Sequence, residues 1–149
     1  MEQKTFEKIK EELLLRAKKA GACQIGYAMG LRSQSKADIL KAITDNWFWV
    51  LRTARIVDAE YLEDNFTEEE LTEAGIYTQK YHEVTTTSFA CGSATVEAYD
   101  SATVEAYENS YVEDLTGNIR PQSGYAVIKD YYNHKIYIKK GRYQIVEVD

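Results

Sequence analysis

The spacing of hydrophobic residues changes near residue 75. Before that point, apolar residues recur at the three- and four-residue intervals that are typical of amphipathic helices. From Ile76 onward they alternate with polar residues at a period of two, which is typical of β-strands. We therefore expect an α+β protein, with an N-terminal helical bundle at residues 1–75 and a β-domain at residues 76–149.

The helical half contains recognisable starts and stops. The first helix is expected from Thr5 to about Ala20, and Gly21 stands where a C-cap glycine belongs. Ser35 and Asp38 form an S-x-x-D capping box for a later helix. Further helical segments are expected at 22–31, at Asn46–Leu51 behind Asp45 as N-cap, from Asp58, and from Thr67 (with Glu70 in its capping box) to Gly75.

The β half contains an internal repeat of eight residues. Gly92–Tyr99 and Asp100–Tyr107 are identical at seven of eight positions. At a spacing of sixteen the pattern continues through 92–99, 108–115 and 124–131, with a small third residue and a β-branched fifth residue. An even period keeps each side chain on one face of its strand, and a repeated unit is typical of stacked architectures. This pattern predicts a short two-sided β-solenoid with about sixteen residues per coil.

An antiparallel β-meander is the alternative fold. The solenoid places Val96 beside Val112, whereas the meander places it beside Val104. In either case a C-terminal hairpin is expected, with strands at Lys135–Ile138 and Tyr143–Val148 around Lys139-Lys140-Gly141-Arg142. Before it, Asn118-Ile119-Arg120-Pro121 interrupts the octads. Such a hairpin would cap the last coil.

Acidic residues are concentrated in the middle of the chain. The net charge is −6, but residues 1–55 carry +5, residues 56–119 carry −14 and residues 120–149 carry +3. This acidic block is either a solvated face or a surface that attracts a basic partner. Part of it has a structural reason, because acids in a first helical turn suit the helix dipole.

The candidate partner surface combines carboxylates and tyrosines. Stacked in register, the octads would form outward rows of both, and such a row of carboxylates could imitate a nucleic-acid backbone. Large aromatic side chains are also enriched at interface hot spots. The expected binding residues are Glu97, Tyr99, Asp100, Glu105, Tyr107, Glu108, Tyr111, Glu113 and Asp114, together with Glu68, Glu69 and Glu70.

No arrangement of residues predicts an enzyme, a metal site or a cofactor. His82 and His134 do not have zinc-ligand spacing, and Cys23 and Cys91 are expected to be free thiols. Glu97, Glu105 and Glu113 would lie on a convex wet surface, not in the cleft that a glycosidase needs. We therefore expect a non-enzymatic protein with no catalytic residue, no metal and no cofactor.

The expected location is the cytoplasm. The N-terminal sequence MEQKTFEKIK lacks the apolar region of a signal peptide, and no apolar run approaches the roughly 20 residues of a membrane span. Direct nucleic-acid binding through the lysine-rich first helix or Lys139-Lys140-Gly141-Arg142 is less favoured, because the acidic block would repel phosphate.

The octads also carry a resemblance. Repeats of the form S-A-T-V-x-A-[YW], with AGAC-x-x-GY (Ala20–Tyr27) and GIY (Gly75–Tyr77), resemble proteins from bacteriophages and mobile elements of gut bacteria, of Bacteroidales type. The resemblance implies a helical N-terminus, a β-solenoid and a bacterial host cytoplasm, and it implies no catalytic residues. The expected function is inhibition of a host defence nuclease, in the manner of an anti-CRISPR protein, by an acidic surface that binds a basic site. The alternative is a structural protein that forms oligomers through solenoid edges.

Overall fold

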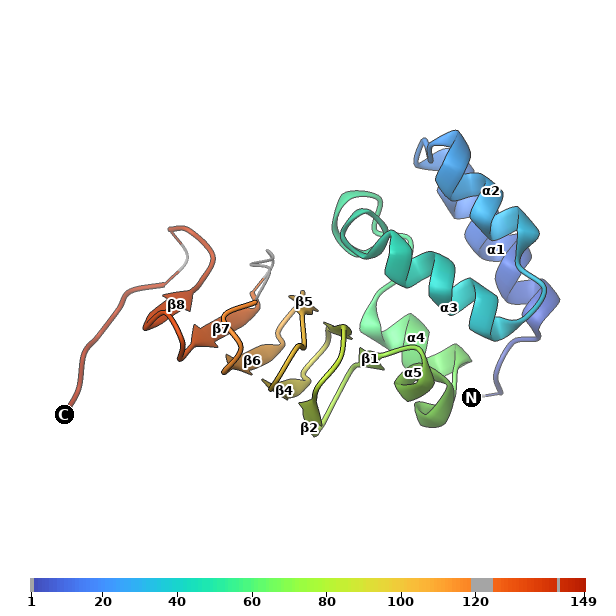
Figure 1. Ribbon diagram of the computed structural model, residues 1–149. Helices are drawn as coiled ribbons and strands as arrows, with labels where there is room; N and C mark the ends of the chain where they lie inside the picture. Colours follow the sequence, from blue (N-terminus) through green and yellow to red (C-terminus); the bar gives the residue numbers. More distant parts are fainter. Residues whose placement is uncertain (1, 119–124, 142) are drawn as a thin grey trace. The chain divides into compact units, whose positions relative to one another are not determined.

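The computed structural model describes residues 2–118, 125–141 and 143–149. The chain divides into two compact units, Met1–Thr78 and Gln79–Asp149, whereas the sequence pattern placed the boundary after residue 75. The first unit is helical and the second is a short β-solenoid (Figure 1). The predicted α+β fold class is therefore confirmed.

The helices of the first unit begin where the capping residues predict. The side chains of Thr5, Ser35, Asp58 and Thr67 each accept a hydrogen bond from the backbone N–H three residues later. Such a bond satisfies an N–H that has no partner inside the helix. The elements are α1 (Phe6–Lys19), α2 (Gln24–Arg32), α3 (Lys36–Asp45), η1 (Trp49–Thr53), α4 (Ala59–Asn65), α5 (Glu68–Glu73) and the short strand β1 (Ile76–Tyr77).

The prediction for Asn46–Leu51 was wrong in its start. Asp45 is the last residue of α3, where Lys41 pairs with its carboxylate at 3.2 Å, and it is not an N-cap. Residues 47 and 48 are already helical, and the π-helix η1 continues from them at Trp49. Of the aromatic residues before it, Trp47 is buried whereas Phe48 is 41% exposed.

The solenoid consists of two sets of parallel strands. Strands β2 (Tyr81–Val84), β4 (Thr95–Ala98), β6 (Tyr111–Asp114) and β7 (Val127–Asp130) pair in that order, and β3 (Ser88–Ala90) pairs with β5 (Val104–Ala106). Val96 aligns with Val112, as the solenoid requires. The antiparallel meander is therefore excluded for these strands.

The interior of the solenoid is narrow and uniform. Along each strand, buried residues alternate with half-buried ones. Most of the buried positions hold Ala or Val, for example Val96, Ala98, Val104 and Ala106, which are at most 1% exposed. Small side chains of this kind allow the two walls of a thin coil to approach closely.

The first position of each octad forms a corner. Gly92, Asp100 and Glu108 have φ angles of 60°, 53° and 59°. This left-handed conformation favours glycine and is unusual for a side chain such as glutamate. Each octad is therefore one corner followed by one strand, which explains the eight-residue period.

The C-terminal hairpin forms one strand earlier than predicted. Strand β8 (Lys135–Tyr137) pairs antiparallel with β7, and residues 143–149 form no strand. Asp130 stabilises the turn between them, because its carboxylate accepts hydrogen bonds from the backbone N–H and the side chain of Asn133 at 3.0 and 2.7 Å. Residues 119–124, which include Gly124 and all of the predicted interruption except Asn118, lie outside the described residues, as does Arg142 of the predicted turn.

Candidate functional site: a carboxylate row on the solenoid

Three glutamates form a row across neighbouring strands. Glu83 on β2 aligns with Glu97 on β4, and Glu97 aligns with Glu113 on β6. The next position in the row, on β7, is Lys129. Because neighbouring strands lie about 4.8 Å apart, the three carboxylates follow one another at close spacing. We call Glu83, Glu97 and Glu113 the carboxylate row.

The alternation of each strand directs this row outward. Glu97 lies between the buried Val96 and Ala98, Glu113 lies between the buried Val112 and Asp114, and Glu83 precedes the buried Val84. Successive side chains of a strand point to opposite faces. The valines therefore fill the interior and the carboxylates line the outer face of the sheet formed by β2, β4, β6 and β7.

Tyrosines hold the carboxylates in place. The hydroxyl groups of Tyr81 and Tyr99 donate to the two carboxylate oxygens of Glu97, one from each side. The hydroxyl group of Tyr131 donates to Glu113 at 3.4 Å. The Glu97 side chain is therefore oriented by its neighbours on the same face.

These hydrogen bonds also shift the ionisation of the groups involved. Donation from Tyr81 and Tyr99 lowers the pKa of Glu97, because a hydrogen bond to the charged form stabilises it. The same bonds raise the pKa of Tyr99 to about 12 and raise that of Tyr81 as well. At neutral pH, Glu97 is therefore a carboxylate held between two neutral phenols.

The arrangement is suited to electrostatic attraction. Like charges on directly paired strands are unfavourable. The row has a basic residue in register only at its β7 end, where Lys129 lies. The ammonium of Lys129 is 4.7 Å from the centre of the Tyr131 ring.

Among the described residues, no group of three or more His, Cys, Asp or Glu side chains could hold a metal ion. The described helices include none with the length and apolar character to cross a bilayer.

The structure brings together only part of the predicted surface. Glu97, Tyr99, Tyr111 and Glu113 lie on or beside the face of the carboxylate row. Glu105 belongs to β5 in the other sheet, where it aligns with Phe89, so the predicted single row of Glu97, Glu105 and Glu113 is wrong. The coil length of sixteen residues explains this, because octads one step apart fall on opposite sheets. Tyr107 follows β5, and Asp100 and Glu108 occupy corners.

Asp114 is a correction to the predicted surface. It is 1% exposed, and its carboxylate accepts hydrogen bonds from the backbone N–H groups of Thr116 and Gly117 and from the Thr116 hydroxyl at 2.7 Å. It therefore stabilises the turn after β6 and offers no outward contact. The remaining predicted residues, Glu68, Glu69 and Glu70, form the first turn of α5 in the helical unit.

The sixteen-residue pattern placed Lys129 in register with Glu97 and Glu113, as observed, but it missed Tyr81 and Glu83 as members of this face. The first coil explains this, because Tyr81 aligns with Thr95 and the coil is fourteen residues long, not sixteen. The turn at residues 85–87 is two residues shorter than the turn at 99–103. Two is an even number, so side chains on β2 still point to the same face of the sheet as their partners on β4. A search of the sequence that allowed a coil of fourteen residues would have found Glu83.

Comparison of the chain with protein-family models, with curated proteins and with solved structures found no match.

Proposed function

We propose that this chain is a non-enzymatic binding protein, and that its carboxylate row binds a basic site on a partner protein. The observation that supports the proposal is the register of Glu83, Glu97 and Glu113 on directly paired strands. Such a row is unfavourable for the isolated solenoid, and positive charges of a partner would remove that repulsion. Complementary charge also accelerates association.

The tyrosines support a role in binding beyond charge alone. Tyr81 and Tyr99 fix both oxygens of Glu97, so little side-chain freedom is lost when a partner binds. Tyr81 and Tyr131 are 53% and 42% exposed and supply aromatic area beside the carboxylates. Exposed tyrosines next to fixed charges are typical of interface hot spots.

A nuclease of a host defence system is the partner that we propose to test first. Proteins that bind nucleic acids present Lys and Arg side chains to phosphates, and a row of carboxylates would compete for those side chains. The resemblance of the octads to proteins of bacteriophages and mobile elements supports this choice. The place of action that we propose is a bacterial cytoplasm. In this proposal the protein acts as an inhibitor by occupying the nucleic-acid site.

Neutralising the carboxylate row tests the proposal. The test variant carries Glu83→Gln, Glu97→Gln and Glu113→Gln, and partners captured from host lysate by the wild-type protein are purified and measured individually. The association rate is expected to fall about tenfold at low salt. The control variant carries Glu2→Gln, Glu7→Gln and Glu11→Gln, which changes the net charge equally on exposed residues in and just before α1, outside the expected binding residues.

The control separates the local row from the net charge of the protein. Equal loss in both variants would show that only net charge matters, and no loss in the first would exclude the row as the contact. A nuclease partner adds two expectations: added salt weakens the complex, because salt screens exposed charges, and an oligonucleotide displaces the protein. A complex that both leave unchanged contradicts the proposed mechanism.

Assembly through a solenoid edge is the second candidate. It is favoured by exposed apolar residues at the C-terminal end, because β8 is the edge of its sheet and Ile136, Ile145 and Val148 are 62%, 77% and 87% exposed. An unpaired edge strand offers backbone groups to another chain. Light scattering should then show an oligomer that Ile136→Lys dissociates, whereas a monomer at high concentration excludes this role.

A further inference from the structure

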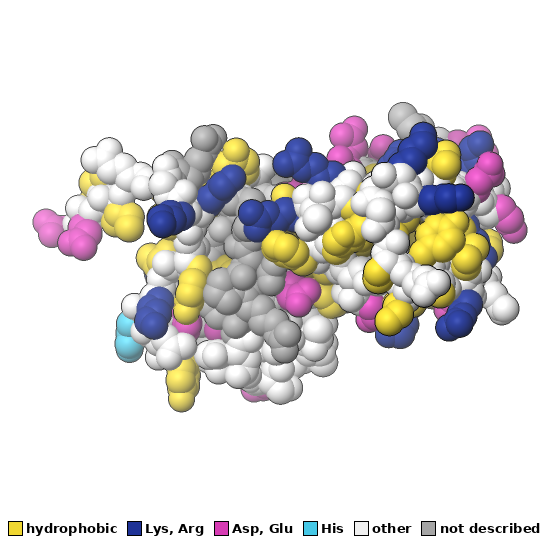
Figure 2. All heavy atoms as spheres, turned by 90° about the horizontal axis from the view of Figure 1, so that it is seen from above, with side chains coloured by type: hydrophobic (Ala, Val, Ile, Leu, Met, Phe, Trp, Pro, Cys, Tyr) yellow, Lys and Arg dark blue, Asp and Glu magenta, His cyan; other side chains and the backbone are white. Residues whose placement is uncertain are grey.

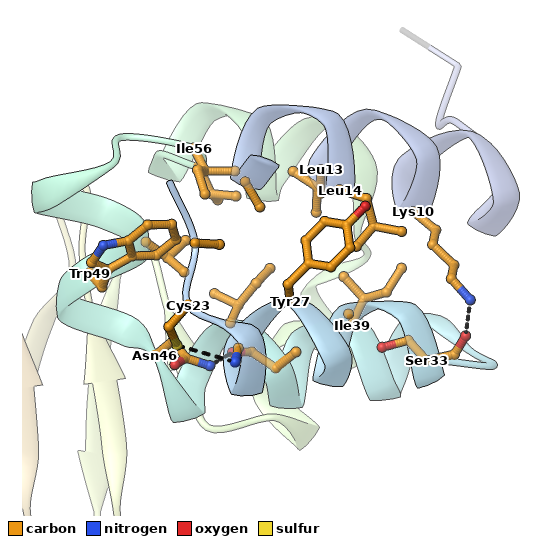
Figure 3. Close-up of a pocket in the computed structure, with 18 of the residues that line it drawn as sticks. Lys10, Leu13, Leu14, Cys23, Tyr27, Ser33, Ile39, Asn46, Trp49 and Ile56 are labelled. Atoms are coloured by element: carbon orange, nitrogen blue, oxygen red, sulfur yellow. Dashed lines mark hydrogen bonds between the residues drawn. The ribbon is translucent and has the colours of Figure 1, made fainter. Parts of the chain in front are cut away.

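The helical unit contains a cavity that is separate from the carboxylate row. It has a volume of about 240 Å³, is partly open to solvent, and is lined by residues of α1, α2, α3, η1 and the segment that follows η1 (Figure 3). Its walls are mainly aliphatic, with Leu13, Leu14, Ile39, Ile43 and Val57 among the lining residues. An apolar cavity of about 150 Å³ is enough to bind benzene. This one therefore has room for a ligand larger than one aromatic ring.

Helix α2 shows that the core under it is incomplete. The helix has an apolar sequence, yet none of its residues is buried, and Ile25 and Leu31 are 78% and 51% exposed. Hydrophobic side chains reach the surface between Lys and Arg side chains on the face of the helical unit seen in Figure 2. An amphipathic helix in a filled core would bury one stripe of its side chains.

The cavity does not arise from a helix that is merely displaced. A Cβ atom at Gly30 would lie only 2.9 Å from Cδ2 of Leu14, so α2 and α1 are already in close contact there. This contact limits how closely α2 can approach α1 at Gly30. The walls thus keep the cavity open, with Leu13, Leu14 and Tyr27 only half-buried around it.

One end of the cavity is basic. Among the described lining residues, Lys10 is the single base, and none is Asp or Glu. Its ammonium group donates to the carbonyl oxygens of Leu31 and Ser33 at 2.7 and 2.8 Å, which fixes its position at the end of α2. Its other neighbour is the Phe6 ring, whose centre lies 5.8 Å from Nζ. An ammonium has three donors, so a third hydrogen bond can still be made to a ligand.

The opposite end is aromatic. Figure 3 shows Trp49 at one end of the cavity and Lys10 at the other, with Tyr27 between them. A ligand that fills this space is therefore elongated, apolar along its length and anionic at one end. The π-helix that begins at Trp49 adds to this view, because such segments are frequent at functional sites.

We propose that the cavity between α1, α2 and α3 binds an aliphatic monocarboxylic acid, with its carboxylate on Lys10 and its chain directed toward Trp49. The proposal is independent of the carboxylate row, which lies in the other unit. Each methylene that enters the cavity is expected to lower the Kd about fourfold. The charged hydrogen bond to Lys10 is expected to contribute about tenfold.

Titration of the full chain with decanoic acid and with decanol tests the proposal. We expect decanoic acid to bind about tenfold more tightly than decanol, and Lys10→Gln to abolish this difference while decanol binding is retained. A decanoic acid brominated at its terminal carbon should quench the fluorescence of Trp49, so Trp49→Phe should remove the quenching and Trp47→Phe should not. Absence of decanoic acid binding to the wild-type chain overturns the proposal.

Two further measurements decide the location of the ligand. Ala17→Leu, in the lining, should fill the cavity and abolish binding, whereas Ala20→Leu, an exposed residue outside it, should not. Bound decanoic acid should also slow alkylation of Cys23, an exposed lining residue, while the buried Cys91 provides an unreactive internal reference. Binding that Ala17→Leu leaves unchanged, or equal affinities for the acid and the alcohol in the wild type, overturns the assignment.

Discussion

The two units of this chain are packed according to different principles. The solenoid repeats a few small side chains in a narrow interior, where Ala94, Ala98, Ala102 and Ala106 are fully buried. The helical unit combines large side chains of different shapes and leaves a cavity of about 240 Å³. Regular stacking thus buries small side chains fully, whereas the irregular packing of the helices leaves a cavity.

This difference teaches where the chain tolerates change. In a close-packed interior, the addition of even one methylene group lowers stability. In the solenoid, a larger side chain in one coil would also displace the coils stacked on it. In the helical unit an additional side chain has space to enter. Function follows the same division, because a rigid solenoid is suited to hold surface charges in fixed positions, and a cavity is suited to hold a ligand.

Enlarging one alanine in each unit should give the largest contrast. Ala106→Leu in the solenoid is expected to destabilise that unit by about 3 kcal/mol, because overpacking forces the backbone apart. Ala42→Leu, in the cavity lining, is expected to cost less than about 1 kcal/mol, because the new side chain fills empty space. Hydrogen exchange reports the solenoid, and fluorescence reports the helical unit, which contains both tryptophans. Equal destabilisation would refute the difference in packing.

Removing the buried carboxylate of Asp114 should have the next largest effect. Asp114→Ala is expected to destabilise the solenoid by about 2 kcal/mol, because three hydrogen bonds from Thr116 and Gly117 lose their acceptor. Asp114→Asn keeps one acceptor oxygen and should cost less. Urea unfolding followed by hydrogen exchange measures both, and partner binding of Asp114→Asn should equal that of the wild type. A loss of binding without a loss of stability would restore Asp114 as a contact.

Acid should affect each unit through a different carboxylate. Burial opposes ionisation of Asp130, but the hydrogen bonds from Asn133 lower its pKa below the ordinary value. Its stabilising contribution is therefore present above about pH 4, the usual range of an unfolded Asp, and is lost as the pH falls through the lower folded pKa. Asp130→Asn should destabilise the solenoid by about 1 kcal/mol at neutral pH and flatten its response to acid.

The helical unit serves as the internal control for this pH experiment. Its acid-sensitive group is Glu12, whose pKa is lowered chiefly by the hydrogen bond from Lys4, at 2.7 Å. The fluorescence transition of this unit should therefore remain unchanged in Asp130→Asn. Glu97, whose pKa is also lowered, contributes a residual acid response of the solenoid in both proteins.

Sequence patterns predicted the parts of the fold that depend on local or repeated interactions. Capping residues such as Ser35 and Thr67 act within three residues, so their helices were expected at the positions observed. The alignment of Val96 with Val112 followed from the sixteen-residue coil, because a periodic sequence stacks like residues on like.

What the patterns missed depends on contacts between distant segments. The cavity could not be predicted, because it depends on how the side chains of three helices fit together. The burial of Asp114 was missed because an acidic residue in an alternating strand resembles an outward one, although it occupies the inward position next to Val112. Glu83, the member of the carboxylate row on β2, was missed because the first coil is two residues shorter than the next one.

Exchanging residues at the solenoid corners should give the smallest effect. Asp100 has a φ angle of 53° and is exposed, so Asp100→Gly should stabilise the solenoid by about 0.5 kcal/mol, since glycine adopts this conformation without strain. Gly92→Asp, at the same octad position, should have the opposite sign. Glu105→Gly, within β5, should cost about 0.5 to 1 kcal/mol, because glycine weakens a strand. Urea midpoints measured by hydrogen exchange rank the three variants, and destabilisation by Asp100→Gly equal to that by Glu105→Gly would show that the corners do not set the eight-residue period.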